Sequence, residues 1–255
     1  MSSITNPIVE QLLNHRSIRH FKNKKLTDAQ IDELIEAAQH ASTSTFSQQY
    51  SIISVTDRHV LEEFAKITGH PWLLESAHYF VMVADQYRNL QIAKAQNADP
   101  FLLHTTDKFL ASVFDASIAT ENIMVAAESM GLGATIMGSI LNDSKKIINL
   151  LGLPQLTFPL LGIAIGYPDD QPELKPRLPK EEIYFQERYQ LPADQTALQQ
   201  YDQLLQAYYQ NRSSNSRDET FTHHITSEVN RGHHIRADLL NNIQSQGFLV
   251  AQTKD

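Results

Sequence analysis

Residues 103–130 read LHTTDKFLASVFDASIATENIMVAAESM and form the longest helical pattern in the chain. Charges are few, and apolar side chains recur at helical spacing, namely Phe109, Val113, Ala116, Ile123, Met124 and Ala127. A helix that is apolar around most of its surface is buried in a protein core. The stretch therefore predicts one long core helix, and Gly131, directly after it, is typical of a helix C-terminus.

Four shorter apolar segments have the composition of β-strands. They are rich in aliphatic and β-branched residues and are bounded by polar residues or glycine. Residues 158–166 are apolar at almost every position, which is typical of a strand buried on both faces. The sequence predicts strands at residues 51–56, 79–84, 133–139 and 158–166.

Several other stretches predict helices. Thr27 and Gln30 have the spacing of a capping box, in which each side chain accepts a hydrogen bond from the other residue's backbone amide. The apolar spacing that begins at Ile31 ends before the hydroxyl-rich run at residues 41–49, which by itself is typical of a surface loop. Further helices are predicted at residues 8–13, 58–68, 142–152 and 196–210, with a helix and loop within 85–100 and two short helices between 221 and 248.

The composition is that of a large globular domain. The chain has 255 residues, of which 42% are hydrophobic and 20% charged, so it can bury a substantial core. Its net charge of −8 argues against a general binder of nucleic acids or anionic membranes. The absence of cysteine excludes disulfides, thiolate nucleophiles and iron–sulfur clusters. We expect a cytoplasmic protein, because no apolar run approaches the roughly 20 residues of a membrane span and no signal peptide is evident.

Two short stretches concentrate positive charge in this acidic chain. The first is His15-Arg16-Ser17-Ile18-Arg19-His20-Phe21, and the second is Lys175-Pro176-Arg177, which prolines stiffen. Two fixed basic clusters suit one phosphorylated ligand. The alternative for the first cluster is a charged cap after a short helix, where cations are favoured by the helix dipole.

Other kinds of site have less support. His223-His224 and His233-His234 are adjacent pairs, and neighbours on a helix point about 100° apart, which is poor geometry for joint metal binding. The chain contains no Gly-x-Ser-x-Gly elbow, no Gly-x-Gly-x-x-Gly and no P-loop. A phosphate would therefore be held by side chains, and not by a glycine-rich loop at a helix start.

A specific resemblance emerges from the order of six motifs. They are His-Arg-Ser-Ile-Arg-His-Phe at 15–21, the Ser/Thr run at 42–49, Gly-Leu-Gly at 131–133, Leu-Gly-Ile-Ala-Ile-Gly-Tyr-Pro at 161–168, Leu-Lys-Pro-Arg-Leu-Pro at 174–179 and Asn-Arg-Ser-Ser-Asn-Ser-Arg at 211–217. In this order they resemble the FMN-dependent nitroreductase family, and in particular its NADPH-preferring, oxygen-insensitive nitroreductase and flavin reductase branch. The similarity extends over nearly the whole chain.

The resemblance implies an α+β fold with a mostly antiparallel central sheet wrapped by helices. It also implies an intertwined homodimer with two FMN sites at the subunit interface, in which residues 103–130 would form the dimer core. We expect one nitroreductase-like domain over residues 1–255, with a helical excursion and C-terminal extension at about 180–255.

The resemblance also assigns site residues to both cofactors. Arg212 and Arg217 match the basic loop that recognises the 2′-phosphate of NADPH. Those matching FMN contacts are His15, Arg16, Ser17 and Arg19 in the first basic cluster, Thr43 and Ser44 in the hydroxyl-rich run, Met137, Gly138 and Ser139 beside the flavin ring, and Lys175 and Arg177 at the phosphate.

Two positions depart from the family pattern. Pro71, after His70, stands near the flavin where this branch usually has a glutamine, so one ring or substrate contact is missing or replaced. Gly138-Ser139 stands where a Gly-Gly step is usual beside the ring, which would narrow or repolarise the pocket.

The activity implied by the resemblance is two-electron, ping-pong transfer from NADPH through FMN to nitroaromatics, quinones or flavins. The flavin supplies the chemistry, so no protein group is expected to act as a catalytic acid or base. Two alternatives remain open. One is a dedicated NADPH:FMN reductase that supplies reduced flavin to a partner, and the other is a flavin-binding protein without turnover, against which the intact Arg212 and Arg217 argue.

Overall fold

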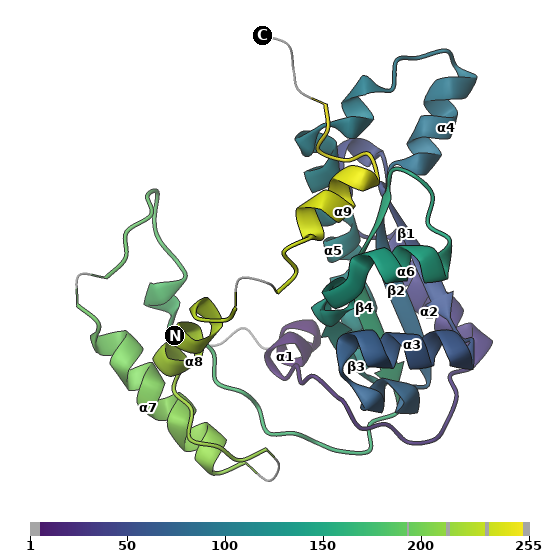
Figure 1. Ribbon diagram of the computed structural model, residues 1–255. Coiled ribbons are helices and arrows are strands. Elements are labelled where there is room, and N and C mark those ends of the chain that lie inside the picture. Colours follow the sequence, from purple (N-terminus) through teal and green to yellow (C-terminus); the bar gives the residue numbers. More distant parts are fainter. Residues whose placement is uncertain (1–5, 193, 213–214, 233–234, 252–255) are drawn as a thin grey trace. The chain divides into compact units, whose positions relative to one another are not determined.

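The computed structural model describes residues 6–192, 194–212, 215–232 and 235–251 (Figure 1). The chain divides into two compact units. The first comprises the described residues up to Gln171 and from Arg236 onward, and the second comprises those from Pro172 to Ile235.

The first unit is built on a four-stranded sheet. Its strands are β1 (Tyr50–Val55), β2 (His78–Asp85), β3 (Gly133–Met137) and β4 (Thr157–Gly166), in the spatial order β1-β2-β4-β3. All three neighbouring pairs are antiparallel, which confirms the predicted α+β class with an antiparallel central sheet. Both central strands are almost wholly buried, as their continuous apolar runs predict.

Helices cover both faces of this sheet, because alternate side chains of each strand point to opposite faces. On one face, α5 (Thr106–Ser129) and α2 (Asp28–Gln39) pack over Phe80 and Met82 of β2. The other face of β2 carries Tyr79, Val81 and Val83, and it is covered by α3 (Arg58–Thr68) and by the turn η4 (Gly138–Asp143) with α6 (Ser144–Leu151).

The remaining described elements are mostly short, and α7 in the second unit is the longest of them. The first unit contains α1 (Pro7–Leu13), α4 (Tyr87–Ala95), α9 (Leu239–Ser245) and the single turns η1 (Ser44–Phe46), η2 (Pro71–Glu75) and η3 (Phe101–His104). In the second unit α7 (Thr196–Gln210) packs on α8 (Phe221–Val229), with the turn η5 (Lys180–Glu182) nearby.

Most element boundaries agree with the sequence prediction. The ranges of α3 and α7 are as predicted, and the capping box of Thr27 and Gln30 is present at the start of α2. The strand predicted for 133–139 is wrong at its end, since β3 stops at Met137. There the chain turns into η4, which lets Ile140 pack into the core beside Tyr79.

The prediction that the longest helix is buried nearly all round is wrong for the single chain. One face of α5 packs on the sheet, but Leu110 (44% exposed), Phe114 (57%) and Ile118 (43%) form an apolar stripe on the opposite face. Their spacing of four residues places them on one side of the helix. The expectation that no apolar run approaches the length of a membrane span is wrong for α5, which by length and composition is the single helix among the described residues that could cross a membrane. In the structure, 44% of its most apolar window is buried inside the protein.

Candidate functional site

The first basic cluster is fixed by its backbone. It runs beside β3, where Ser17 forms a parallel bridge with Ala134 and the amide of Ile18 donates to the carbonyl of Ala134 at 3.0 Å. The hydroxyl of Thr135 donates to the carbonyl of Ile18 at 2.5 Å. Because β3 is an edge strand, this segment uses hydrogen-bonding groups that would otherwise be unpaired.

Two glycines make room for this segment. Gly133 and Gly166 face each other across the β3–β4 pair. A Cβ at Gly133 would lie 2.5 Å from Cγ1 of Ile18, and one at Gly166 would lie 2.7 Å from Cδ1 of Phe21. Three of the six sequence motifs therefore meet at one place, where Ile18 and Phe21 are buried and their polar neighbours in the sequence are held at the surface.

Arg16 of this segment borders a pocket of about 410 Å³, which Glu128 and Asp170 also line. His15 Nδ1 lies 2.5 Å from Oε1 of Glu128 in the last turn of α5. Arg16 donates from Nη1 to the carbonyl of Asn14 at 2.8 Å, but its Nε is buried without a hydrogen-bond partner among the described residues. Oδ1 of Asp170, in the same pocket, is also buried and unpaired. These atoms leave one donor and one acceptor available to a polar ligand.

Arg19 has a different environment from Arg16. Its side chain is exposed, and within the described part of the chain no hydrogen bond or ion pair engages its guanidinium. It follows the buried Ile18, which fixes where its backbone lies. A planar, permanently charged group with free donors is therefore carried by a fixed point of the backbone.

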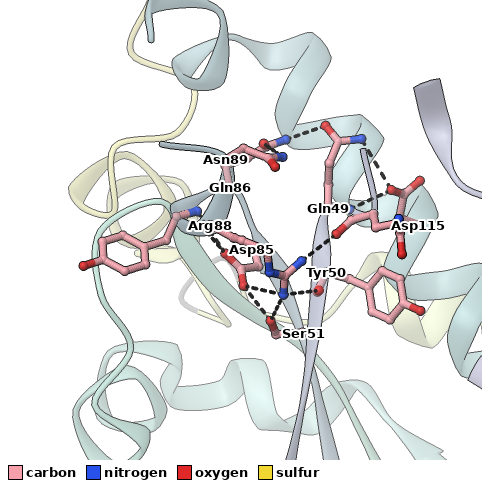
Figure 2. A network of polar contacts seen from close by, with 10 residues as sticks. Gln49, Tyr50, Ser51, Asp85, Gln86, Arg88, Asn89 and Asp115 are labelled. Carbon is pink, nitrogen blue, oxygen red and sulfur yellow. Dashed lines mark hydrogen bonds and ion pairs between the residues drawn. The ribbon is translucent and has the colours of Figure 1, made fainter. Parts of the chain in front are cut away.

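Thr43 and Ser44 lie on a separate loop before β1. The carboxylate of Asp115 on α5 accepts a hydrogen bond from the amide of Ser44 at 2.7 Å. Figure 2 shows the polar network in which Asp115 also bonds to Gln49, at the end of this loop. Burial, followed by the negative charge of Asp115, raises the pKa of the adjacent Tyr50. None of the hydrogen bonds among the described residues joins this loop to residues 15–19.

The remaining predicted contacts of the first unit lie at turns. Met137 ends β3, and Gly138 and Ser139 begin η4. Pro71 is exposed at the first position of η2, next to His70 and Trp72, whose ring centroids are 5.3 Å apart. The position of the expected glutamine is thus occupied by a proline that starts a helical turn, and its neighbours in the sequence on both sides are aromatic.

The second unit gathers three of the four predicted cations around one aromatic ring. Nζ of Lys175 lies 5.5 Å from the ring centroid of Tyr209, and the guanidinium carbons of Arg212 and Arg217 lie at 5.8 and 3.9 Å. Cations over an aromatic face are attracted by the ring quadrupole. Nε of Arg212 is buried without a hydrogen-bond partner among the described residues, so it remains available to an anion.

Tyrosines of α7 also fix the second basic cluster. Tyr201 donates its hydroxyl hydrogen bond to the carbonyl of Pro176 at 3.1 Å, and Tyr208 donates to that of Glu173 at 3.4 Å. Burial raises the pKa of Tyr201, while the nearby charge of Arg177 opposes that rise. The segment that carries Lys175 and Arg177 is therefore held along α7.

An acidic residue lies beside these cations. Oε2 of Glu219 is 3.4 Å from Nε of Arg217, and its Oε1 is 2.7 Å from Nδ1 of His223. His223 thus has a carboxylate partner, and the described part of the chain contains no group of three residues suited to hold a metal ion. The pair His233-His234 lies outside the described residues.

The sequence analysis missed Asp115, Glu128 and Tyr209. Asp115 carries a signal, because it is an acid within an otherwise apolar helix face. Glu128 carries another, since a carboxylate in the last turn of a helix is disfavoured by the dipole. Tyr209 has no comparable signal, because a tyrosine at helical spacing is equally typical of a core position.

Comparison with known proteins places nearly the whole chain in one group. The model of the nitroreductase family matches residues 12–167, and the model of the nitroreductase family C-terminal domain matches residues 175–251. An FMN reductase (NADPH) of Bacillus subtilis is 39% identical over 224 residues, which cover 86% of this chain and 90% of the relative. An NADPH-dependent oxidoreductase of Staphylococcus aureus is 36% identical over 240 residues, which cover 92% and 95%.

Solved structures give the same result. The NfrA1 nitroreductase of B. subtilis aligns with a TM-score of 0.90 at 36% identity, covering 95% of this chain and 99% of that one. An NADPH:FMN oxidoreductase from Vibrio harveyi, solved with NAD⁺, aligns with a TM-score of 0.85 at 33% identity, covering 96% and 100%.

Proposed function

The chain belongs to the nitroreductase family, and we propose that it is an NADPH-dependent FMN oxidoreductase. When bound, FMN would supply the two-electron chemistry between NADPH and an aromatic acceptor. Nitroaromatics, quinones and flavins are the proposed acceptors. The protein's own part is to bind, orient and polarise these molecules.

The observation that carries the proposal is the set of cations with unused donors. Arg16 and Arg212 each have a buried Nε without a partner among the described residues. Buried polar groups in proteins are normally paired, so an unpaired guanidinium nitrogen fits a site that an anionic ligand completes. In a chain with a net charge of −8, these local positive charges are suited to phosphorylated cofactors.

Each proposed contact has a definite role. His15, Arg16 and Ser17 would hold the body of FMN, Arg19 would interact with the flavin ring, and Lys175 and Arg177 would bind the phosphate. Thr43, Ser44, Pro71, Met137, Gly138 and Ser139 line the remaining cofactor surface. Arg212 and Arg217 bind the 2′-phosphate of NADPH. We propose that both units act together as one functional domain.

The functional molecule in this proposal is a homodimer. The exposed stripe of Leu110, Phe114 and Ile118 on α5 is an apolar surface that a second copy would cover. On α1, Ile8 (63% exposed) and Leu13 (70% exposed) are further exposed apolar side chains. A dimer also explains why Thr43 and Ser44 make no bond to residues 15–19 within one chain, since the two sets can serve different flavins. Gel filtration at monomer size would contradict this part of the proposal.

One spectrum tests the central claim. The purified protein should show the absorbance bands of bound flavin, and NADPH should bleach them under anaerobic conditions. Adding a nitroaromatic or quinone should then restore the oxidised spectrum. Protein that stays colourless after FMN is supplied would refute the proposal.

A dedicated flavin reductase is the second candidate, because the B. subtilis relative is named FMN reductase (NADPH). A turnover rate with free FMN far above that with quinones or nitro compounds would favour it. We also propose a cytoplasmic location, which the absence of cysteine fits, since a chain without disulfides needs no oxidising compartment.

A further inference from the structure

The loop of residues 43–49 has an unusual backbone. Thr45, Phe46 and Gln48 are not glycine, yet their φ angles of 52°, 56° and 47° lie in the left-handed region. Such residues persist only where the surrounding structure holds them, and they cluster at binding sites. The side chain of Phe46 is 82% exposed, so this loop is not folded around a hydrophobic anchor of its own.

One buried carboxylate holds both ends of this loop. Asp115 is fully buried on α5. Its Oδ1 accepts the amide hydrogen bond of Ser44 at 2.7 Å, and its Oδ2 accepts those of the Gln49 amide at 2.9 Å and the Gln49 side chain at 3.4 Å. Figure 2 shows this carboxylate pointing from the helix toward the loop.

Neighbouring side chains strengthen the same attachment. Nε2 of Gln86 lies 2.6 Å from Oε1 of Gln49 and 3.0 Å from the hydroxyl of Ser112, one turn before Asp115. From α4, Arg88 donates to the carbonyl of the left-handed Gln48 at 3.0 Å (Figure 2). The loop is therefore held at its start, at its end and at one strained residue.

The chemistry of the carboxylate explains its place in a core helix. An ionised carboxylate only accepts hydrogen bonds, and burying it is unfavourable unless donors surround it. Within the described part of the chain, the three donors to the Asp115 carboxylate come from Ser44 and Gln49. An apolar side chain would be better for packing α5 alone, so the acid serves the loop.

We propose that Asp115 is the positioning residue that fixes residues 43–49 in the geometry that the flavin and the electron acceptor require. This inference rests on the proposed function, in which Thr43 and Ser44 contact FMN. The same loop also lines a hollow of about 870 Å³ through Phe46, Ser47 and Gln48, so its conformation shapes the open surface as well.

The test compares Asp115→Asn with a matched control. In either orientation of the new amide, its NH₂ group faces a backbone N–H of Ser44 or Gln49, so at least one bond is lost. Thr120→Val is the control, because Thr120 is on the same helix and is 1% exposed, and its hydroxyl donates to the carbonyl of Ala116 at 2.7 Å, with no other partner among the described residues. Both holoproteins are compared with the wild type by amide hydrogen exchange, by visible circular dichroism of the flavin, and by steady-state kinetics.

We expect exchange at Ser44 and Gln49 to be at least tenfold faster in Asp115→Asn and unchanged in Thr120→Val. The flavin circular dichroism should change, and the KM for a quinone acceptor should rise at least tenfold with a smaller change in the KM for NADPH. Unchanged exchange would overturn the proposal. Faster exchange with unaltered spectra and kinetics would also overturn it, because Asp115 would then only support folding.

If Asp115→Asn does not fold, Gln49→Leu replaces it. This variant keeps the Asp115 carboxylate and its bond to Ser44, and it should raise the rate of amide hydrogen exchange in the loop two- to fivefold. An unchanged exchange rate would overturn the proposal that Asp115 fixes the loop. The exchange measurement does not depend on flavin chemistry. A wild-type protein that neither binds FMN nor oxidises NADPH would refute the proposed function, while the exchange rates would still judge the attachment of the loop.

Discussion

The positive charges of the two units are held in different ways. In the first unit, Arg16 and Arg19 belong to a segment whose backbone pairs with β3 and whose apolar residues are seated over two glycines. In the second unit, the side chains of Lys175, Arg212 and Arg217 meet around the ring of Tyr209. The segment that carries Lys175 is bonded to tyrosine hydroxyls of α7, and in the described part of the chain it pairs with no strand.

We call residues 15–21, seated on Gly133 and Gly166, the frame. We call the side chains of Lys175, Arg212 and Arg217 around Tyr209 the grip. A segment held by its backbone presents its side chains from fixed points, whereas a long cationic side chain over a ring retains rotamer freedom. We therefore expect changes in the frame to alter stability and flavin binding together. Changes in the grip should alter ligand affinity and leave the fold intact.

The largest effect is expected for the double change Lys175→Ala and Arg177→Ala. Both side chains are exposed, so their loss should leave thermal stability unchanged. Charge-assisted contacts are worth roughly 1.5–3 kcal/mol each, so losing two should weaken FMN binding by a factor of about 100 or more. Titration of the apoprotein with FMN, followed by flavin fluorescence, measures this change. Retention of FMN at wild-type affinity would show that the phosphate is bound elsewhere.

Gly133→Ala tests the frame. The new Cβ would lie 2.5 Å from Cγ1 of Ile18, and overpacking of this kind costs about 1–3 kcal/mol. Urea unfolding should show that loss of stability, and the folded protein should retain less flavin because residues 15–19 have shifted. In combination with Ile18→Ala, which restores space, the total loss should be smaller than the sum of the two single losses. Additive losses would mean that the two positions are not coupled.

The separate helices and strands could be predicted from the sequence, but the contacts that build the frame could not. Local periodicity is sufficient for α3, α7 and the buried strands β2 and β4, because the pattern is set by residues close in sequence. The seat of Ile18 on Gly133 joins segments more than 100 residues apart, and local pattern contains no such information.

The lack of long-range information in a local pattern also explains why α5 was wrongly predicted to be buried nearly all round. Apolar residues all round a helix predict burial, but they do not tell whether the covering surface belongs to the same chain. Leu110, Phe114 and Ile118 are exposed in one chain, although the pattern gives them the same expectation as Ile123, which is fully buried against the sheet. Asp115 is visible in the sequence as an acid in a mostly apolar helix, but its partners Ser44 and Gln49 lie more than 60 residues away, so local pattern does not tell what the acid binds.

A smaller effect is expected for Arg217→Ala, which tests the grip. If this residue binds the 2′-phosphate, its loss should raise the KM for NADPH about tenfold, corresponding to ~1.4 kcal/mol, and leave that for NADH nearly unchanged. Arg231→Ala is a matched control, because Arg231 is also in the second unit and pairs with Glu228 at 2.8 Å as Arg217 pairs with Glu219. An equal loss for both nucleotides would assign the loop another role.

The smallest effect is expected for Arg19→Ala. This variant tests whether the frame also shifts the midpoint potential of the flavin, in addition to binding it. Arg19 is exposed and unengaged among the described residues, and the proposal places it at the edge of the flavin ring that gains negative charge on reduction. A fixed cation there favours the reduced flavin over the oxidised one. If that preference is worth about 1.4 kcal/mol or less, the two-electron midpoint potential should fall by roughly 30 mV or less in the variant. Arg16→Ala is the comparison. Loss of a residue that binds the body of FMN should weaken FMN affinity and leave the midpoint potential of the bound flavin unchanged. Spectroelectrochemistry on flavin-saturated protein measures both variants. An unshifted potential with weakened binding in Arg19→Ala would reduce Arg19 to the same anchoring role as Arg16.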